Sequence, residues 1–289
     1  MTPETTITVH TLSDTKCILG EGALWHPERG TFFWFDILGH KLFEHDGSAQ
    51  RSWDFDGAVS AGGWVDRDRL LIASERDLFV FDLRDGSQTH VVDLEADMPA
   101  NRSNDGRADP QGGFWIGTMG YKFEDKAGSI YRYYKGELRR IFPDITITNA
   151  ICFAPDGRTA YYADTPTRTV RKVALDADGW PVGESSLHVD MTDQPVVKPD
   201  GAVIDTEGRL WTAQWGSKRV ACYGTDGAFL RAIETPAVQA SCPAFGGPDL
   251  RRLFVTSASD RLPEDPEGGK TFYVDLDDVQ GQAEHRVIL

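Results

Sequence analysis

Residues 153–164 read FAPDGRTAYYAD, in which a Pro-Asp-Gly turn signal separates a short apolar run from a second run of aromatic and small residues. Two such runs joined by turn residues are typical of a β-hairpin. Related stretches recur along the chain every 39 to 51 residues. The six stretches begin at Trp25, Trp64, Ala108, Phe153, Ile204 and Phe245. This spacing is close to the ~40 to 45 residues of a four-stranded propeller blade.

Each of these hairpins is followed by a second one, such as RDLFVFDLRDG at 76–86 or GSIYRYYKGEL at 128–138. Two hairpins per repeat make a four-stranded antiparallel blade, and no segment shows a sustained helical period. The sequence therefore predicts an all-β fold, a six-bladed β-propeller, as a single domain over residues 1–289. A strand from one end of the chain is expected to complete the last blade, and both 6–12 (TITVHTL) and 285–289 (HRVIL) fit this role.

Composition excludes several classes of function. The net charge is -15, with 30 basic and 45 acidic residues, which argues against nucleic acid as a partner. No apolar run approaches the ~18 residues of a membrane span, and the first residues lack a basic and then apolar leader, so we expect a cytoplasmic protein away from membranes. The oligomeric state stays open. The cysteines lack CxxC spacing and are expected to be buried free thiols; they are Cys17, Cys152, Cys222 and Cys242.

A polar side chain stands four residues before the start of each repeat. If a rotation relates the repeats, these side chains form one ring around the propeller axis. The ring residues are Glu21, Ser60, Asn104, Asn149, Asp200 and Ser241. A ring with two carboxylates and two amides offers the oxygen ligands that hard cations prefer.

Glu21, Asn149 and Asp200 are the predicted metal ligands of this ring. Glycines on both sides of Glu21 leave its oxygens open to approach. Asp200 stands in a Pro-Asp-Gly sequence that would ordinarily be a β-turn. However, the turn of its repeat falls at 206–208, so Asp200 corresponds to Asn149 instead. Two carboxylates and an amide suit one divalent Ca, Mg, Mn or Fe(II) ion, and Zn stays open.

Arg102 and Asn104 are predicted to bind the substrate. They are two residues apart, so on an extended segment both side chains face the axis. A salt bridge between Arg102 and the neighbouring Asp105 is an equally good interpretation of the local sequence. The long connection 119–128 (MGYKFEDKAG) either covers the axis as a lid or is a merely exposed loop.

Other site types lack their sequence signals. The seven histidines form no HxH or HExxH pattern, and neither G-x-S-x-G nor a P-loop occurs. The tryptophans at strand positions are expected in the core; these are Trp25, Trp115, Trp211 and Trp215.

Five segments in chain order carry a family resemblance. They are LGEGALW at 19–25, NRSNDGRADPQGGFWIGTM at 101–119, TITNAICFAPDG at 146–157, KPDGAVIDTEGRLWTAQWG at 198–216 and CPAFGGPDLRRLFVTSA at 242–258. At these residues the chain resembles the SMP-30/gluconolactonase/regucalcin-like family of six-bladed propeller lactonases. Within it, the chain is most similar in appearance to bacterial sugar-acid lactonases of the xylono- and arabinolactonase type.

The resemblance implies roles for the same five side chains. It implies that Glu21, Asn149 and Asp200 bind one divalent metal, and that Arg102 and Asn104 bind a sugar lactone. The chain departs from the family at 120–122, where regucalcin-like members carry acidic residues and this chain reads Gly-Tyr-Lys.

We therefore expect a metal-dependent hydrolase of sugar oxidation metabolism that opens an aldonolactone to its aldonic acid. Asp200 is expected to act also as the catalytic base toward water. Two alternatives stay open: a metal-dependent esterase or phosphotriesterase using the same site, and a non-catalytic propeller that binds calcium or another protein.

Overall fold

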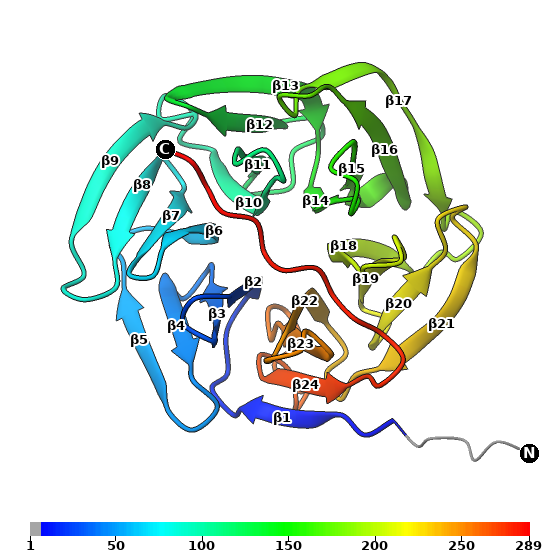
Figure 1. Cartoon of the computed structure of the whole chain (residues 1–289). Helices are drawn as coiled ribbons and strands as arrows, with labels where there is room; N and C mark the ends of the chain where they lie inside the picture. Colours follow the sequence, from blue (N-terminus) through cyan, green and yellow to red (C-terminus); the bar gives the residue numbers. More distant parts are fainter. Residues whose placement is uncertain (1–6) are drawn as a thin grey trace, which may run out of the picture.

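Six four-stranded antiparallel sheets form a ring in the computed structural model, which describes residues 7–289 (Figure 1). The predicted six-bladed propeller is thus confirmed. In each of the first five blades the strands follow one another outward from the axis in chain order. No helix in this described part is long and apolar enough to cross a membrane.

The strands have the following bounds. Blade 1 consists of β2 (Gly20–His26), β3 (Thr31–Asp36), β4 (Lys41–His45) and β5 (Gln50–Asp54). Blade 2 consists of β6 (Val59–Asp66), β7 (Arg69–Ser74), β8 (Asp77–Asp82) and β9 (Gln88–Asp93). Blade 3 consists of β10 (Asn101–Ala108), β11 (Phe114–Gly120), β12 (Gly128–Tyr134) and β13 (Glu137–Ile145).

Blade 4 consists of β14 (Thr148–Phe153), β15 (Thr159–Asp164), β16 (Thr169–Leu175) and β17 (Pro181–Asp190), with the short 3-10 helix η1 (Thr165–Thr167) after β15. Blade 5 consists of β18 (Lys198–Ile204), β19 (Leu210–Trp215), β20 (Arg219–Tyr223) and β21 (Phe229–Glu234). Blade 6 consists of β22 (Ala240–Gly246), β23 (Arg252–Ser257), β24 (Thr271–Asp275) and, from the other end of the chain, β1 (His10–Ser13).

The N-terminal strand closes the ring. β1 pairs antiparallel with β24, with His10 opposite Tyr273. Of the two segments expected to close the propeller, 6–12 therefore supplies the strand, and its first residue lies outside the described residues. Closure by a distant strand joins the first and last blades, so the last blade leaves no gap in the ring.

The C-terminal segment 281–289 crosses the axis instead of joining a blade (Figure 1). Its Gln282 amide donates hydrogen bonds of 3.0 Å to the carbonyls of Phe153 and Ile204, which end β14 and β18. The backbone N–H of Ile288 donates to the carbonyl of Gly112 at 2.8 Å. The segment thus covers the end of the central channel at which the innermost strands finish.

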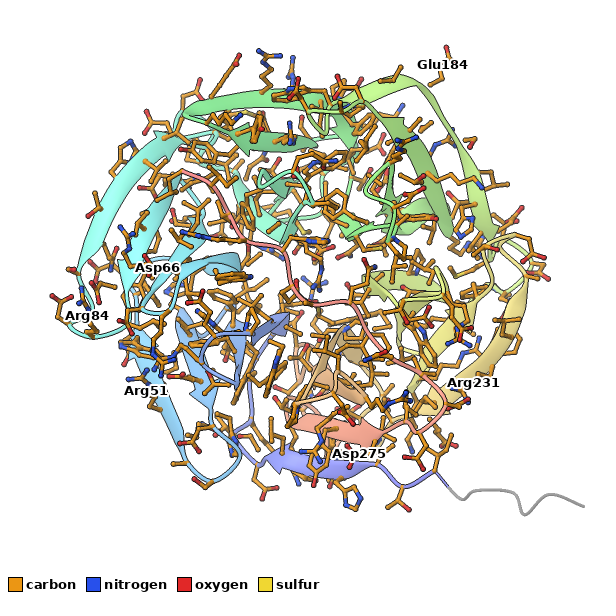
Figure 2. All side chains as sticks on the ribbon, in the orientation of Figure 1. Arg51, Asp66, Arg84, Glu184, Arg231 and Asp275 are labelled. Atoms are coloured by element: carbon orange, nitrogen blue, oxygen red, sulfur yellow. The ribbon has the colours of Figure 1, made fainter. Side chains whose placement is uncertain are left out.

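Apolar side chains fill the space between the blades. Trp34, Trp115 and Trp211 are fully buried, and each buried aromatic side chain contributes roughly 1.5–3 kcal/mol of burial free energy. The four cysteines are free and buried, as expected. Charged side chains such as Arg84 and Arg231 lie at the outer edge of the ring (Figure 2).

Every innermost strand carries a register shift near its ring residue. The shift lies between Glu21 and Leu24 in β2, between Asn149 and Cys152 in β14, and between Pro199 and Ala202 in β18. β6, β10 and β22 have corresponding shifts. Bulges of this kind bend a strand and redirect a side chain. The repeat therefore fixes the backbone geometry of the site as well as its position.

Candidate active site

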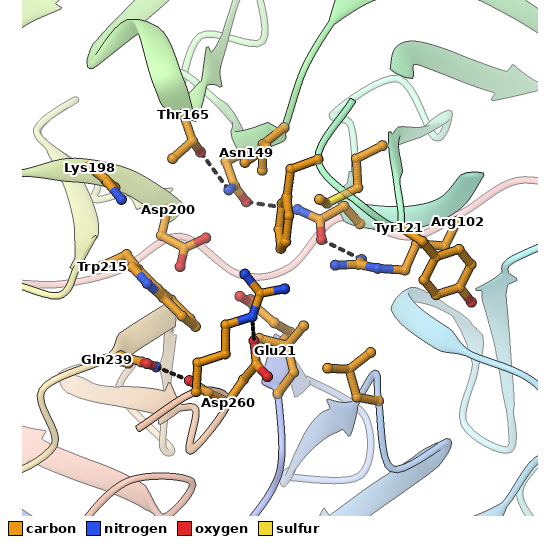
Figure 3. Close-up of a pocket in the computed structure, with 17 residues that line it drawn as sticks. Glu21, Arg102, Tyr121, Asn149, Thr165, Lys198, Asp200, Trp215, Gln239 and Asp260 are labelled. Atoms are coloured by element: carbon orange, nitrogen blue, oxygen red, sulfur yellow. Dashed lines mark hydrogen bonds and ion pairs between the residues drawn. The ribbon is translucent and has the colours of Figure 1, made fainter. Parts of the chain in front are cut away.

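A cavity of about 540 Å³ opens at the end of the axis where the innermost strands begin (Figure 3). All five predicted site residues line it. They come from four blades: Glu21 from β2, Arg102 and Asn104 from β10, Asn149 from β14 and Asp200 from β18. The structure thus brings together residues separated by up to 179 positions in the sequence.

The two ring serines have another environment. Ser60 is fully buried and donates a hydrogen bond of 2.7 Å to the Ser103 hydroxyl of the next blade. Ser241 is also fully buried and donates to the carbonyl of Gly20, so it connects blade 6 to blade 1. These serines hold neighbouring blades together and do not line the cavity.

Glu21 and Asp200 form a buried pair of carboxyl groups. Their exposed fractions are 6% and 4%. Burial, and then the charge of Asp200, raises the pKa of Glu21 well above its ordinary value. Burial, and then the charge of Asp105, does the same to the pKa of Asp200. Two like charges held together in a dry site are unfavourable unless a cation joins them.

Asn149 is held in place through its amide nitrogen. Its Nδ2 donates 2.8 Å to the Thr165 hydroxyl, which itself donates 2.8 Å to the carbonyl of Pro199, next to Asp200. The next residue, Ala150, has a left-handed φ of 56°. For a residue with a side chain this conformation costs roughly 1–2 kcal/mol. The local backbone is thus held in an unfavourable conformation beside this predicted ligand.

The chemistry of these donors fits a hard divalent cation. Two carboxylates and an amide oxygen are ligands typical of Ca, Mg or Mn rather than of thiolate-seeking metals. Within residues 7–289 there is no cluster of three His, Cys, Asp or Glu side chains that could hold a metal ion. The site described here has two carboxyl groups, and its third oxygen is that of the Asn149 amide. Glu21, Asn149 and Asp200 are therefore the residues that would hold the ion.

Arg102 is buried in the cavity wall and fixed by its neighbours. Its Nη1 donates to the Asn104 amide oxygen at 2.7 Å and to the Ser103 carbonyl at 2.8 Å. The alternative ion pair with Asp105 does not form; Asp105 instead accepts a hydrogen bond of 2.7 Å from the Ile151 N–H. Burial raises the pKa of Asp105 to about 6. Arg102 keeps further N–H groups that have no partner among the described residues.

Residues 19–259 match the model of the SMP-30/gluconolactonase/LRE-like region. The chain belongs to this family. It is 42% identical over 284 residues to a provisionally named sugar lactone lactonase of Rhizobium meliloti, with 95% of both chains covered. It is 36% identical to the L-arabinolactonase of Azospirillum brasilense, over 90% of this chain and 89% of that one.

A solved structure of the family is also very similar. The crystal structure of a calcium-binding protein, regucalcin, from Agrobacterium tumefaciens has 40% sequence identity and a TM-score of 0.94, over 98% of both chains. The family resemblance seen in the sequence is therefore confirmed, and with it the fold.

The connection 119–128, where the chain departs from the regucalcin-like pattern, contributes two aromatic side chains to the cavity. Tyr121 lines the cavity, and its ring centre lies 6.0 Å from the Arg102 guanidinium carbon. Its hydroxyl donates to Glu75, which comes from a different blade. Phe123 lines the cavity too, so the connection 119–128 covers the mouth rather than lying away from it.

A second ring of residues lines the cavity, and of its members only Arg102 was predicted from the sequence. Each member lies two positions before a ring residue, as Arg102 does before Asn104. The others are Leu19, Ile147, Lys198 and Gln239. The alternation of side chains along a strand that placed Arg102 could have found all of them.

Three further cavity residues were not predicted from the sequence, and little in the sequence marks them as site residues. Trp215, at the end of β19, was expected in the core but lines the cavity instead, because β19 ends at the cavity mouth. Asp260 and Arg261 belong to the loop between β23 and β24, which spans 258–270 and is longer than the corresponding connections of the other blades, so the repeat pattern did not mark these two residues.

Proposed function

We propose that this chain hydrolyses a sugar lactone with the help of one divalent metal ion. The observation that carries the proposal is the buried group of Glu21, Asn149 and Asp200 opposite Arg102 in a single cavity. The name of the Azospirillum brasilense relative, L-arabinolactonase, supports the substrate class. The regucalcin structure, described as calcium-binding, supports a hard cation.

The metal ion would supply Lewis-acid polarisation of the lactone carbonyl when bound. Asp200 takes a proton from the attacking water, whose oxygen bonds to the carbonyl carbon. The ring C–O bond then breaks, and the ring oxygen takes up the proton that Asp200 had accepted and becomes a hydroxyl group. The product is the open aldonic acid.

Arg102 holds the substrate during this reaction. Its position is fixed by Asn104 and by the Ser103 carbonyl, so its remaining N–H groups are aimed into the cavity before substrate arrives. Such preorganised donors hold the ring oxygen or a hydroxyl group in the orientation needed for attack, which lowers the entropic part of the barrier.

The site fits sugar oxidation because aldonolactones arise when an aldose is oxidised at its anomeric carbon. A panel of aldonolactones and aryl phosphate esters separates the proposal from an esterase or phosphotriesterase. We expect acid release from at least one aldonolactone and far slower cleavage of the phosphate esters. Bound stoichiometric metal with no lactone opening would favour a calcium-binding propeller.

A further inference from the structure

One contact spans the cavity mouth from opposite blades of the ring. The guanidinium carbon of Arg261 lies 4.7 Å from the centre of the Phe123 ring, a cation–π arrangement. Arg261 belongs to the loop between β23 and β24 in blade 6, whereas Phe123 belongs to the loop between β11 and β12 in blade 3. These two blades face each other across the axis (Figure 1). The contact therefore holds a positive charge over the mouth.

Both residues hold an uncommon backbone conformation. Phe123 has a φ of 62° and Arg261 a φ of 56°. Bulky side chains rarely adopt left-handed φ values, and such conformations are often retained where they serve a site. Here they accompany two side chains that meet across the mouth of one cavity.

A second cation lies at the same rim. Lys198 lines the cavity, is exposed, and forms no ion pair with any residue of the described chain. One carboxylate of the rim, that of Asp260, forms an ion pair with Arg261, whose Nε lies 3.6 Å from it. The Arg261 side chain is 71% exposed. The rim thus carries two cations and one carboxylate, and Lys198 is the cation left without an ion-pair partner among the described residues.

We propose that Arg261 and Lys198 form an anion-binding subsite, which selects lactones carrying a carboxylate, phosphate or sulfonate on the carbon chain distant from the ring carbonyl. This inference rests on the proposed function, because the carbonyl end lies at the floor near Asp200 and the rest of the substrate extends toward the rim. Phe123 is a positioning residue that holds Arg261 over the mouth.

Two pairs of probes test the subsite. Hydrolysis is compared for glucono-δ-lactone and its 6-phosphate. Binding is compared by calorimetry for the unreactive acids gluconate and 6-phosphogluconate, on the full-length chain supplied with a divalent metal. The binding pair gives a result whether or not the lactones are hydrolysed.

The variants are Arg261→Gln, Lys198→Gln and Phe123→Leu. Arg84→Gln is a matched control, since the Arg84 side chain is 68% exposed, also lies beside an aspartate, and sits at the outer edge of the ring (Figure 2). Phe123→Leu keeps the charge of Arg261 but removes its aromatic support.

The wild-type chain is expected to bind 6-phosphogluconate about tenfold more tightly than gluconate at low salt, with a smaller ratio in about 0.5 M salt. Arg261→Gln and Lys198→Gln each reduce the ratio about threefold to tenfold, as expected for an exposed or partly exposed ion pair. Phe123→Leu also reduces it, whereas Arg84→Gln keeps the wild-type ratio.

Equal affinity of the wild-type chain for the two acids would overturn the inference, as would an unchanged ratio in Arg261→Gln. A clear preference that Arg261→Gln removes, in a protein that hydrolyses neither lactone, would support the subsite and count against the proposed lactonase.

Discussion

Asn104 accepts a hydrogen bond of 2.7 Å from Arg102 through its amide oxygen, and both side chains are buried. The amide nitrogen of Asn104 donates 2.8 Å to the Thr148 carbonyl and 3.3 Å to the Asn149 amide oxygen. One side chain therefore connects the predicted substrate group to the predicted metal ligands. Because its hydrogen bonds go to protein groups, Asn104 acts at least as much by positioning Arg102 as by touching substrate.

Replacing Asn104 by Leu tests this connection. The loss of a hydrogen bond to a charged partner is worth about 1.5–3 kcal/mol, so kcat/KM should fall roughly 10- to 100-fold. Metal stoichiometry should stay near that of the wild type. Steady-state kinetics and metal titration on the same sample give both numbers. A kcat/KM within about twofold of the wild-type value would remove Asn104 from this role.

Asp200→Asn separates the base from the metal ligand. The amide keeps an oxygen for the ion but cannot take a proton from water. We therefore expect kcat to fall about 100- to 10,000-fold. Calorimetric metal titration is the control for ligand loss. If the variant binds metal normally and opens lactones at the wild-type rate, Asp200 is not the base.

Glu21→Gln should change stability in opposite directions with and without metal. In chelator the variant removes one of two buried like charges, so its melting temperature should rise, corresponding to about 1–2 kcal/mol. Added metal should raise the melting temperature of the wild-type chain but hardly that of the variant. Thermal unfolding with and without chelator measures both effects.

Glu44→Gln is a control for that experiment. Glu44 is a second buried carboxylate of blade 1, but it is paired with Arg29 at 2.9 Å and with Arg51, and accepts a hydrogen bond of 2.7 Å from Thr31. Its replacement should lower stability in chelator and in metal alike. If Glu21→Gln behaved in the same way as Glu44→Gln, the two carboxyl groups of the cavity would not be a cation site.

Glu284→Ala tests the segment that crosses the axis. Glu284 pairs with Arg107, and only 8% and 10% of these side chains are exposed. Breaking a buried ion pair leaves a buried charge, so we expect a loss of about 3–5 kcal/mol. Asp275→Ala, which removes the exposed partner of Arg252 at 2.7 Å, should cost under about 1 kcal/mol. Urea unfolding measures the free energy of unfolding of both variants. Equal losses of stability would contradict a stabilising role for the segment that crosses the axis.

The sequence pattern predicted the fold and the centre of the site because both depend on one repeat. The phase of the repeat distinguished Asp200 from an ordinary turn residue and aligned it with Asn149. The register shift near Glu21, Asn149 and Asp200 gives this alignment a backbone basis. Because the same local geometry repeats along the chain, a single sequence is enough to predict the fold and the position of these side chains.

The remaining features depend on contacts that the repeat does not encode. Ser60 and Ser241 share the ring position but are directed toward the neighbouring blade. Arg261 reaches the mouth from the β23–β24 loop, which is longer than the corresponding loops of the other blades. The choice of the N-terminal strand to close the ring, and the course of 281–289 across the axis, result from pairing between distant parts of the chain. No local pattern specifies these contacts.

The most direct measurement is a pH-indicator assay of aldonolactone hydrolysis, run after complete chelation and again with Ca, Mg, Mn, Fe(II) or Zn restored one at a time. The account predicts that acid release falls to the uncatalysed rate on chelation and returns with at least one of these ions. A rate that survives complete chelation would contradict a metal held by Glu21, Asn149 and Asp200.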